Sequence, residues 1–134
     1  MKKIIKTTLA LGVVLIAVIT GCEKNTTLII KPKEVVISDS VYFKTDLVPI
    51  FTKECAKSGC HADGAHEPVL TANKAYNSLI NDPDFVIVSD PENSTLYKRL
   101  TGALSPQMPM GSPKNPSNIN ALVLAWIKQG ALDN

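Results

Sequence analysis

The sequence predicts an all-α fold, built as one small domain of about four helices. Three observations indicate this fold: an apolar face that recurs over residues 43–51, a second one over 119–127, and turn residues that separate shorter helical segments between them. We expect the helical domain to span residues 40–134, after a signal peptide over 1–21 and an extended tether over 22–39.

The first segment is typical of a secretory signal. Three lysines precede an apolar run from Leu9 to Ile19, which is interrupted only by Gly12. Eleven helical residues extend about 16 Å, roughly half of a bilayer core, so this run is too short to cross a membrane. We therefore expect export of the chain.

Cys22 follows Ile19-Thr20-Gly21, and this run resembles the bacterial lipobox, whose cysteine is acylated and becomes the mature N-terminus. The alternative is an ordinary cleaved signal with an incidental cysteine, but an odd cysteine in an exported protein needs an explanation. We expect a lipid anchor at Cys22 and a location in the cell envelope, facing the periplasm or the cell surface. Glu23 differs from the aspartate that retains some lipoproteins in the inner membrane, which gives the outer membrane a slight preference.

Charge excludes one class of partner. Loss of the signal leaves eleven of the fourteen Lys and Arg residues and all twelve Asp and Glu residues, a formal charge of −1. No basic patch survives that would favour nucleic acid.

The first helix of the domain is expected to run from Asp46, as its N-cap, to Cys55. Pro49 then lies in the first turn, where its missing N–H costs no intrahelical bond. The apolar face consists of Phe43, Leu47, Ile50 and Phe51. Thr71 is expected to cap a second helix that ends at Ile80. The inward positions of that helix are Ala75, Tyr76, Leu79 and Ile80.

A turn over residues 81–84 and a short extended run over 85–88 follow. Asn93 or Ser94 starts a third helix that reaches Leu100. Residues 104–116 contain four prolines and are expected to form a loop without regular structure. Ser117 caps the last helix, and Gly130 is expected to stop it. The apolar face of this helix consists of Ile119, Leu122, Val123, Trp126 and Ile127.

The run Cys55-Ala56-Lys57-Ser58-Gly59-Cys60-His61 is the most informative about chemistry. Cys-x-x-Cys-His marks covalent attachment of a c-type haem, and here four residues separate the cysteines instead of two. Two thiols bond the two haem vinyl groups, and the following histidine becomes the proximal iron ligand. The two extra residues must bulge from the loop, and Ser58-Gly59 is permissive backbone for that.

Here the chain resembles a known family, the planctomycete-type cytochrome c domains among small exported c-type cytochromes. The resemblance covers most of residues 46–131, and five segments carry it in the family's order: Asp46–Phe51, Gly59–His61, Asp90–Leu100, Met108–Pro109 and Ala125–Ala131. It implies a cytochrome c-like domain of about four helices around one covalently attached haem c. The implied function is electron transfer with redox partner proteins, by a chain held at the membrane through its lipid anchor.

The second axial ligand is expected from the proline-rich loop, which contains Met108 and Met110. The resemblance favours Met108, because the family's ligand precedes a proline as Met108 precedes Pro109, and Met110 is the fallback. A thioether opposite an imidazole stabilises the ferrous state and raises the potential. Since His61 and Met108 together leave no open iron position, we expect no enzyme activity at the metal.

Two alternatives use the same cysteines. A disulfide between Cys55 and Cys60 would suit an oxidising compartment, and the chain would then be a haem-free surface lipoprotein that binds a partner or ligand. A zinc site from Cys55, Cys60, His61 and His66 is disfavoured, because adjacent Cys60 and His61 point apart.

Other polar and aromatic residues allow more than one role. His66 is expected on the surface, because as a distal ligand it would need a nearly extended chain around the haem edge. Trp126 fits core packing at least as well as haem contact. Lys98 and Arg99 fit a haem propionate or a solvated helix face equally well.

Overall fold

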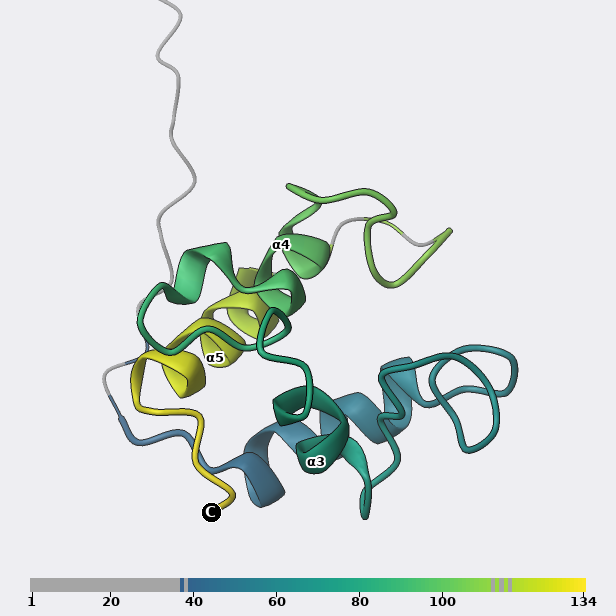
Figure 1. The fold of residues 1–134 in the computed structure, drawn as a ribbon, viewed down its shortest axis with the longest axis horizontal. Coiled ribbons are helices and arrows are strands. Elements are labelled where there is room, and N and C mark those ends of the chain that lie inside the picture. Colours follow the sequence, from purple (N-terminus) through teal and green to yellow (C-terminus); the bar gives the residue numbers. More distant parts are fainter. Residues whose placement is uncertain (1–36, 38, 112, 114, 116) are drawn as a thin grey trace, which may run out of the picture. The chain divides into compact units, whose positions relative to one another are not determined.

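The computed structural model describes residues 37, 39–111, 113, 115 and 117–134, all within one compact unit, Lys33–Asn134. The described chain is helical and contains no β-strand (Figure 1), which confirms the expected all-α class. The expected signal peptide, Cys22 and most of the expected tether lie outside the described residues. Ile37, at the end of the expected tether, packs against the core.

The first helix is continuous and is made of η1 (Phe43–Leu47), α2 (Val48–Ile50) and η2 (Phe51–Cys55). Its two outer parts are wound more widely than an α-helix: the N–H of Ala56, for example, donates to the carbonyl of Phe51 at 2.8 Å, five residues back. Pro49 lies in the middle rather than in the first turn. The Pro49 ring crowds the preceding turn, and its nitrogen carries no hydrogen to donate. The more widely wound turns therefore lie on either side of Pro49.

The expected start of this helix at Asp46 is wrong, because the helix begins at Phe43. Asp46 lies within the first turn, where its carboxylate accepts a hydrogen bond from the Tyr42 N–H at 2.8 Å. The capping group comes from Asn134 instead. Its Oδ1 accepts from the Phe43 N–H at 2.8 Å, and its main-chain carbonyl accepts from the Lys44 N–H at 2.9 Å.

The second helix, α3 (Ala75–Ile80), is shorter than expected. Thr71 lies four residues before the first helical residue and starts a turn. Its carbonyl accepts a hydrogen bond from the Ala75 N–H at 2.9 Å. Ala75 and Leu79 are buried as expected, but Ile80 is 38% exposed, so its expected inward position is wrong. A helix of six residues buries one narrow face, and Ile80 lies beside it.

A 3-10 turn, η3 (Pro91–Asn93), leads into α4 (Thr95–Thr101), and the last helix is α5 (Ser117–Lys128). The described part of residues 102–116 has no regular structure, as expected. Gly130 ends the last helix with φ +100, and the Ala131 N–H donates back to the Trp126 carbonyl at 2.9 Å. This is the Schellman arrangement, which confirms the expected stop.

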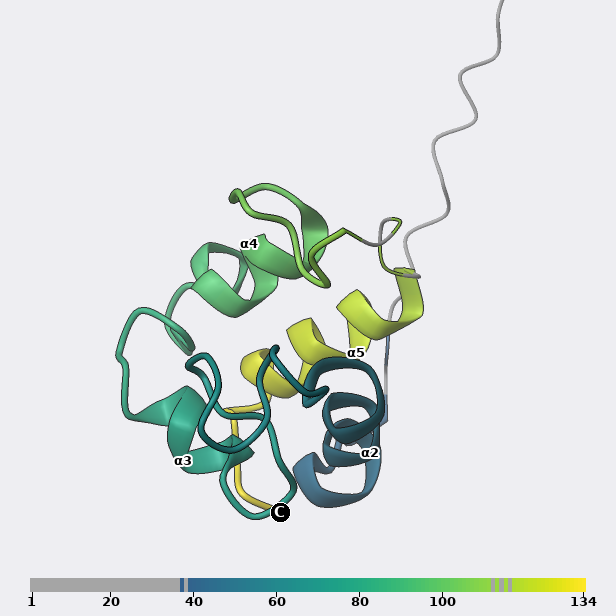
Figure 2. The same cartoon turned by 90° about the vertical axis from the view of Figure 1, so that its right-hand side faces the viewer.

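The core lies where α5 passes between α4 and the first helix (Figure 2). Trp126 is fully buried there, and its ring centroid is 5.0 Å from that of Phe43. The indole N–H donates to the Leu132 carbonyl at 2.9 Å. Core packing thus accounts for Trp126. Within the described part of the chain, no helix has the length and apolarity needed to cross a membrane.

Candidate functional site

The cysteine–histidine run forms a closed loop at the end of the first helix. Cys55 is the last residue of η2, and its carbonyl accepts a hydrogen bond from the His61 N–H at 3.2 Å. Between them, the Cys60 N–H donates to the Lys57 carbonyl at 2.9 Å. Gly59 occupies the third position of that turn with φ +75, which a glycine adopts without strain. The structure thus has a turn at Ser58-Gly59, while the bulge expected there in a haem-bound loop stays a prediction.

Cys55 and Cys60 are both free thiols in this structure. Cys55 is half-buried and packs against the core, whereas Cys60 is exposed. Burial, and secondarily the Glu54 carboxylate, raises the pKa of Cys55 to about 11, against a smaller opposing effect of Lys57. The Cys55 thiol is therefore protonated at neutral pH, and a protonated thiol is a poor nucleophile for disulfide exchange.

The imidazole of His61 is oriented by carbonyl groups of its own loop. Its Nδ1 lies 2.9 Å from the carbonyl oxygen of Pro68 and 3.2 Å from that of His66. Carbonyl oxygens only accept hydrogen bonds, so Nδ1 carries the proton of the neutral ring and Nε2 carries the lone pair. No described residue makes a hydrogen bond to Nε2. The ring thus presents a nitrogen lone pair of the kind that binds metals.

The rest of the loop is held by its own main chain. The N–H groups of His66 and Leu70 donate to the carbonyls of Cys60 and His61 at 2.9 and 2.8 Å. The Thr71 hydroxyl donates to the Asp63 carboxylate at 2.9 Å, and this bond, together with Lys74, holds the pKa of Asp63 below its usual range. The side chain of His66 is exposed, which confirms its expected surface position.

Met108 lies in a second loop, after α4, and is half-buried, whereas Met110 is 73% exposed. Both main-chain polar groups of Met108 are bonded. Its N–H donates to the Arg99 carbonyl at 2.9 Å, and its carbonyl accepts from the Asn115 side-chain amide at 2.9 Å. The Arg99 guanidinium donates to the Pro106 carbonyl at 3.1 Å, so this side chain braces the loop.

The loop of residues 56–70 and the loop of residues 102–111 extend on the same side of the helices (Figure 1), which is the side that faces the viewer in Figure 2. Beneath the second loop, Asn120 is 8% exposed. Its Oδ1 is a buried oxygen without a hydrogen-bond partner among the described residues, while its amide nitrogen lies 3.5 Å from the Leu100 carbonyl. This buried oxygen belongs to a side chain that approaches the same Leu100 carbonyl as the Asn115 amide does.

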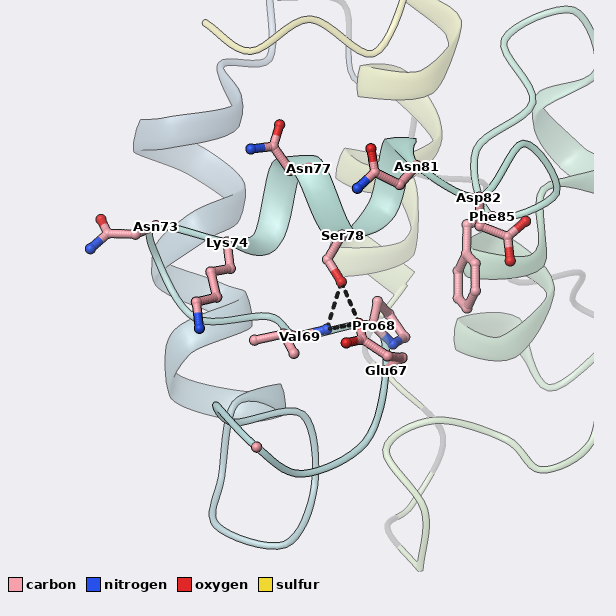
Figure 3. A pocket seen from close by; sticks show the side chains of 11 residues that line it. Glu67, Pro68, Val69, Asn73, Lys74, Asn77, Ser78, Asn81, Asp82 and Phe85 are labelled. Carbon is pink, nitrogen blue, oxygen red and sulfur yellow. Dashed lines mark hydrogen bonds between the residues drawn. The ribbon is translucent and has the colours of Figure 1, made fainter.

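A cavity of about 640 Å³ lies between the first loop and α3 (Figure 3). Its wall includes a network in which the Ser78 hydroxyl donates to the Glu67 carboxylate at 2.7 Å and accepts from the Val69 N–H at 2.7 Å. The cavity is lined mainly by polar side chains, and the loop that carries His61 contributes Gly64, Glu67, Pro68 and Val69 to its lining.

The zinc alternative gains no geometric support. In the ranges that the structure describes, no group of three or more His, Cys, Asp or Glu side chains is close enough to hold a metal ion. The arrangement of the first loop instead combines two separate thiols with one imidazole. Two thiols followed directly by an imidazole are the groups that covalent attachment of a haem through thioethers requires.

Sequence reasoning missed four residues that position these groups: Pro68, Ser78, Asn115 and Asn134. Pro68, Ser78 and Asn134 act through a main-chain carbonyl or through a partner seven or more residues away, and neither kind of contact leaves a local pattern. Asn115 alone carried a signal, because an amide side chain within a proline-rich loop commonly bonds main-chain groups.

No protein-family model matches this chain, and no match was found among curated proteins or solved structures.

Proposed function

We propose that this chain is an exported, lipid-anchored c-type cytochrome that transfers single electrons through one covalently attached haem. The observation that carries the proposal is the orientation of His61. Its Nδ1 is bonded to the Pro68 carbonyl at 2.9 Å, so the lone pair of Nε2 is available, in the residue that directly follows the second of two free thiols.

The residues that would hold the haem are Cys55 and Cys60 through thioethers, and His61 and Met108 as axial ligands. Haem c supplies a one-electron couple whose potential a thioether ligand raises. The chain's own contribution is placement. The turn at Gly59 and the bond between Cys55 and His61 fix the order of the three groups in the first loop.

Burial favours Met108 over Met110 as the thioether ligand. A ligand that stays in place in both oxidation states needs a fixed main chain, and Met108 has both of its main-chain groups bonded, to Arg99 and Asn115. Met110 is 73% exposed, so it would have to leave water to reach an iron within the domain. With both axial positions filled, the proposed role is electron transfer between redox proteins, without substrate chemistry at the metal.

The proposed location follows from Cys22. An acyl chain on this residue would hold the domain at the face of a membrane in the cell envelope. Stable anchoring takes more than one acyl chain, as bacterial lipoproteins have. Labelling with a radioactive or clickable fatty acid, compared between the wild type and Cys22→Ala, tests this part of the proposal by itself.

The haem is tested by expressing the full chain, with its signal, in a host that carries the c-type haem attachment machinery. A denaturing gel is then stained for haem peroxidase activity. The wild type should give a stained band that Cys60→Ala weakens or loses. Cys22→Ala, which removes a cysteine outside the loop, should keep the stain. An unstained band from well-expressed, exported wild type would reject the proposal and favour the disulfide-stapled lipoprotein.

A further inference from the structure

We propose that Ser78 and Glu67 are positioning residues for His61: together they hold the Pro68 carbonyl that orients the imidazole. The inference rests on the function proposed above, but its main observation concerns only residues of this chain. Figure 3 shows the two side chains on the wall of the cavity beside α3, joined to each other and to the main chain of Val69.

The starting point is the position of Pro68. Its side chain is buried, and its carbonyl is the closer of the two acceptors that face the His61 Nδ1, at 2.9 Å against 3.2 Å for His66. The orientation of a carbonyl is set by the peptide unit that it shares with the next residue. Here that unit ends in the N–H of Val69, so whatever holds this N–H also aims the carbonyl.

The Val69 N–H is held by two acceptors at once. It lies 2.7 Å from the Ser78 hydroxyl oxygen and 3.0 Å from the Glu67 carboxylate. The Ser78 hydroxyl donates to the same carboxylate oxygen, and the two oxygen atoms lie 2.7 Å apart. Each donor in this triangle therefore has an acceptor, and the ionised carboxylate strengthens both bonds.

Ser78 connects the triangle to the core. It lies on α3, where its N–H donates to the Lys74 carbonyl at 2.9 Å, and its helix neighbour Leu79 is fully buried. The peptide unit of Pro68 and Val69 is in this way fixed relative to a packed helix. Without that connection, the carbonyl would be fixed only by the loop itself.

The consequence for His61 follows from ordinary ligand chemistry. A firm hydrogen bond from Nδ1 to a carbonyl fixes the ring's tautomer and raises the basicity of Nε2. A more basic imidazole stabilises ferric over ferrous iron. Loss of the Ser78 hydroxyl should therefore weaken the bond to Pro68, release part of the ring population to the other tautomer, and raise the reduction potential.

Two measurements test the proposal on four variants of the full chain. The first is the reduction potential of the haem-loaded, exported protein. The second is the tautomer of His61 from ring nitrogen chemical shifts, measured on the same chain produced in a host without haem attachment machinery. Ser78→Ala should raise the potential and shift the tautomer ratio away from Nδ1–H by roughly threefold or more, the size expected for a weakened hydrogen bond.

The other three variants separate positioning from general stability. Ser78→Thr keeps the hydroxyl and should match the wild type, whereas Glu67→Gln keeps the shape and should give a smaller shift in the same direction. Thr71→Ala removes a different side-chain bond of the loop, to Asp63, and should leave both readouts unchanged. If Ser78→Ala behaves like Thr71→Ala, the proposal is overturned. Because the tautomer is measured without haem, it decides this point even if the haem stain fails.

Discussion

The side chain of Asn134 caps the helix that begins at Phe43: its Oδ1 accepts the hydrogen bond of the Phe43 N–H at 2.8 Å, across 91 positions of sequence. The Asn134 carbonyl serves the Lys44 N–H in the same way, and the Lys44 ammonium lies 3.2 Å from the Asp133 carboxylate. Asn134 therefore satisfies two main-chain donors that a helix start otherwise leaves exposed, and Asp133 binds the Lys44 side chain. This contact holds the helix that leads to Cys55 against the C-terminal segment.

Replacing the cap gives a first prediction. Asn134→Ala should lower the free energy of unfolding by about 1 kcal/mol, the usual cost of losing an N-cap side chain. Urea denaturation followed by fluorescence of Trp126, the single tryptophan of the chain, measures it. Asn118→Ala, at an exposed position of α5, is the matched control and should change stability by much less. Equal effects of the two variants would show that Asn134 does not act as a cap.

The same contact explains why the start of the first helix was predicted incorrectly. Asp46 is a good local N-cap candidate, but the Asn134 side chain, from the other end of the domain, accepts from the Phe43 N–H three residues earlier. A cap supplied by tertiary structure leaves no pattern near the helix. Ile80 was misplaced for a related reason. The length of α3 depends on how it packs against the loop, and only a longer helix would bury that position.

Turns and helix ends that depend on the conformational preference of one residue were predicted correctly. Gly59 and Gly130 both adopt positive φ, where L side chains are strained, and both lie where the sequence indicated a turn or a helix end. Ser94 does precede α4, but its hydroxyl accepts from the Ile87 N–H at 2.9 Å rather than capping the helix. The boundary could be predicted from residue type, while the partner of the side chain could not.

The candidate site likewise contains features that the sequence predicted and features that it did not. Spacing alone predicts that Cys55, Cys60 and His61 share one loop, and residues 55–61 do close through main-chain bonds. The carbonyl of Pro68 was not predicted, because any residue supplies a carbonyl and only the folded loop brings this one to His61. Burial, which distinguishes Met108 from Met110, is likewise not given by the sequence.

A pH-dependent contribution to stability is predicted at the ion pair between Glu92 and Lys128, which lie 2.7 Å apart. The hydrogen bond from Lys128 holds the pKa of Glu92 below its ordinary value of 4.5. For a carboxyl with a lowered folded-state pKa, the contribution is present above 4.5 and is lost as the pH falls through the folded-state value. Denaturation of the wild type and Glu92→Gln should therefore differ at pH 6 to 7 and converge in acid.

Salt provides the control for this pair. Both side chains are about half exposed, at 51% and 54%, so the difference between wild type and Glu92→Gln at neutral pH should be small and should shrink further in about 1 M salt, where screening is strong. A difference that grows as the pH falls would contradict the assigned direction of the pKa shift.

The second loop should loosen when Asn115 is shortened. Its amide donates to the Met108 carbonyl at 2.9 Å, so Asn115→Ala frees this acceptor. The Leu100 carbonyl, 3.4 Å from the same amide, keeps the Asn120 amide at 3.5 Å. Loss of one such bond costs about 1 kcal/mol, which should speed hydrogen exchange of the loop around Met108 by roughly fivefold. Mass spectrometry of deuterium uptake reports it. Asn81→Ala, at an exposed position after α3, should leave that loop unchanged; uniform acceleration across the domain would indicate general destabilisation instead.

The two methionines of this loop give the sharpest test of the proposed ligation. If Met108 is the axial ligand, Met108→Ala should lower the reduction potential and open an iron position to added imidazole. Added imidazole binds only while the axial position is open, so a bound methionine lowers the apparent imidazole affinity. Without that methionine the apparent affinity should rise roughly tenfold or more. Titration followed by the visible spectrum measures both the affinity and the ligand change. Met110→Ala should behave as the wild type, because the exposed Met110 side chain makes little contact with the domain. The reverse result, in which Met110→Ala changes the affinity and Met108→Ala does not, would identify Met110 as the axial ligand. It would also require the loop to turn inward beyond Pro109.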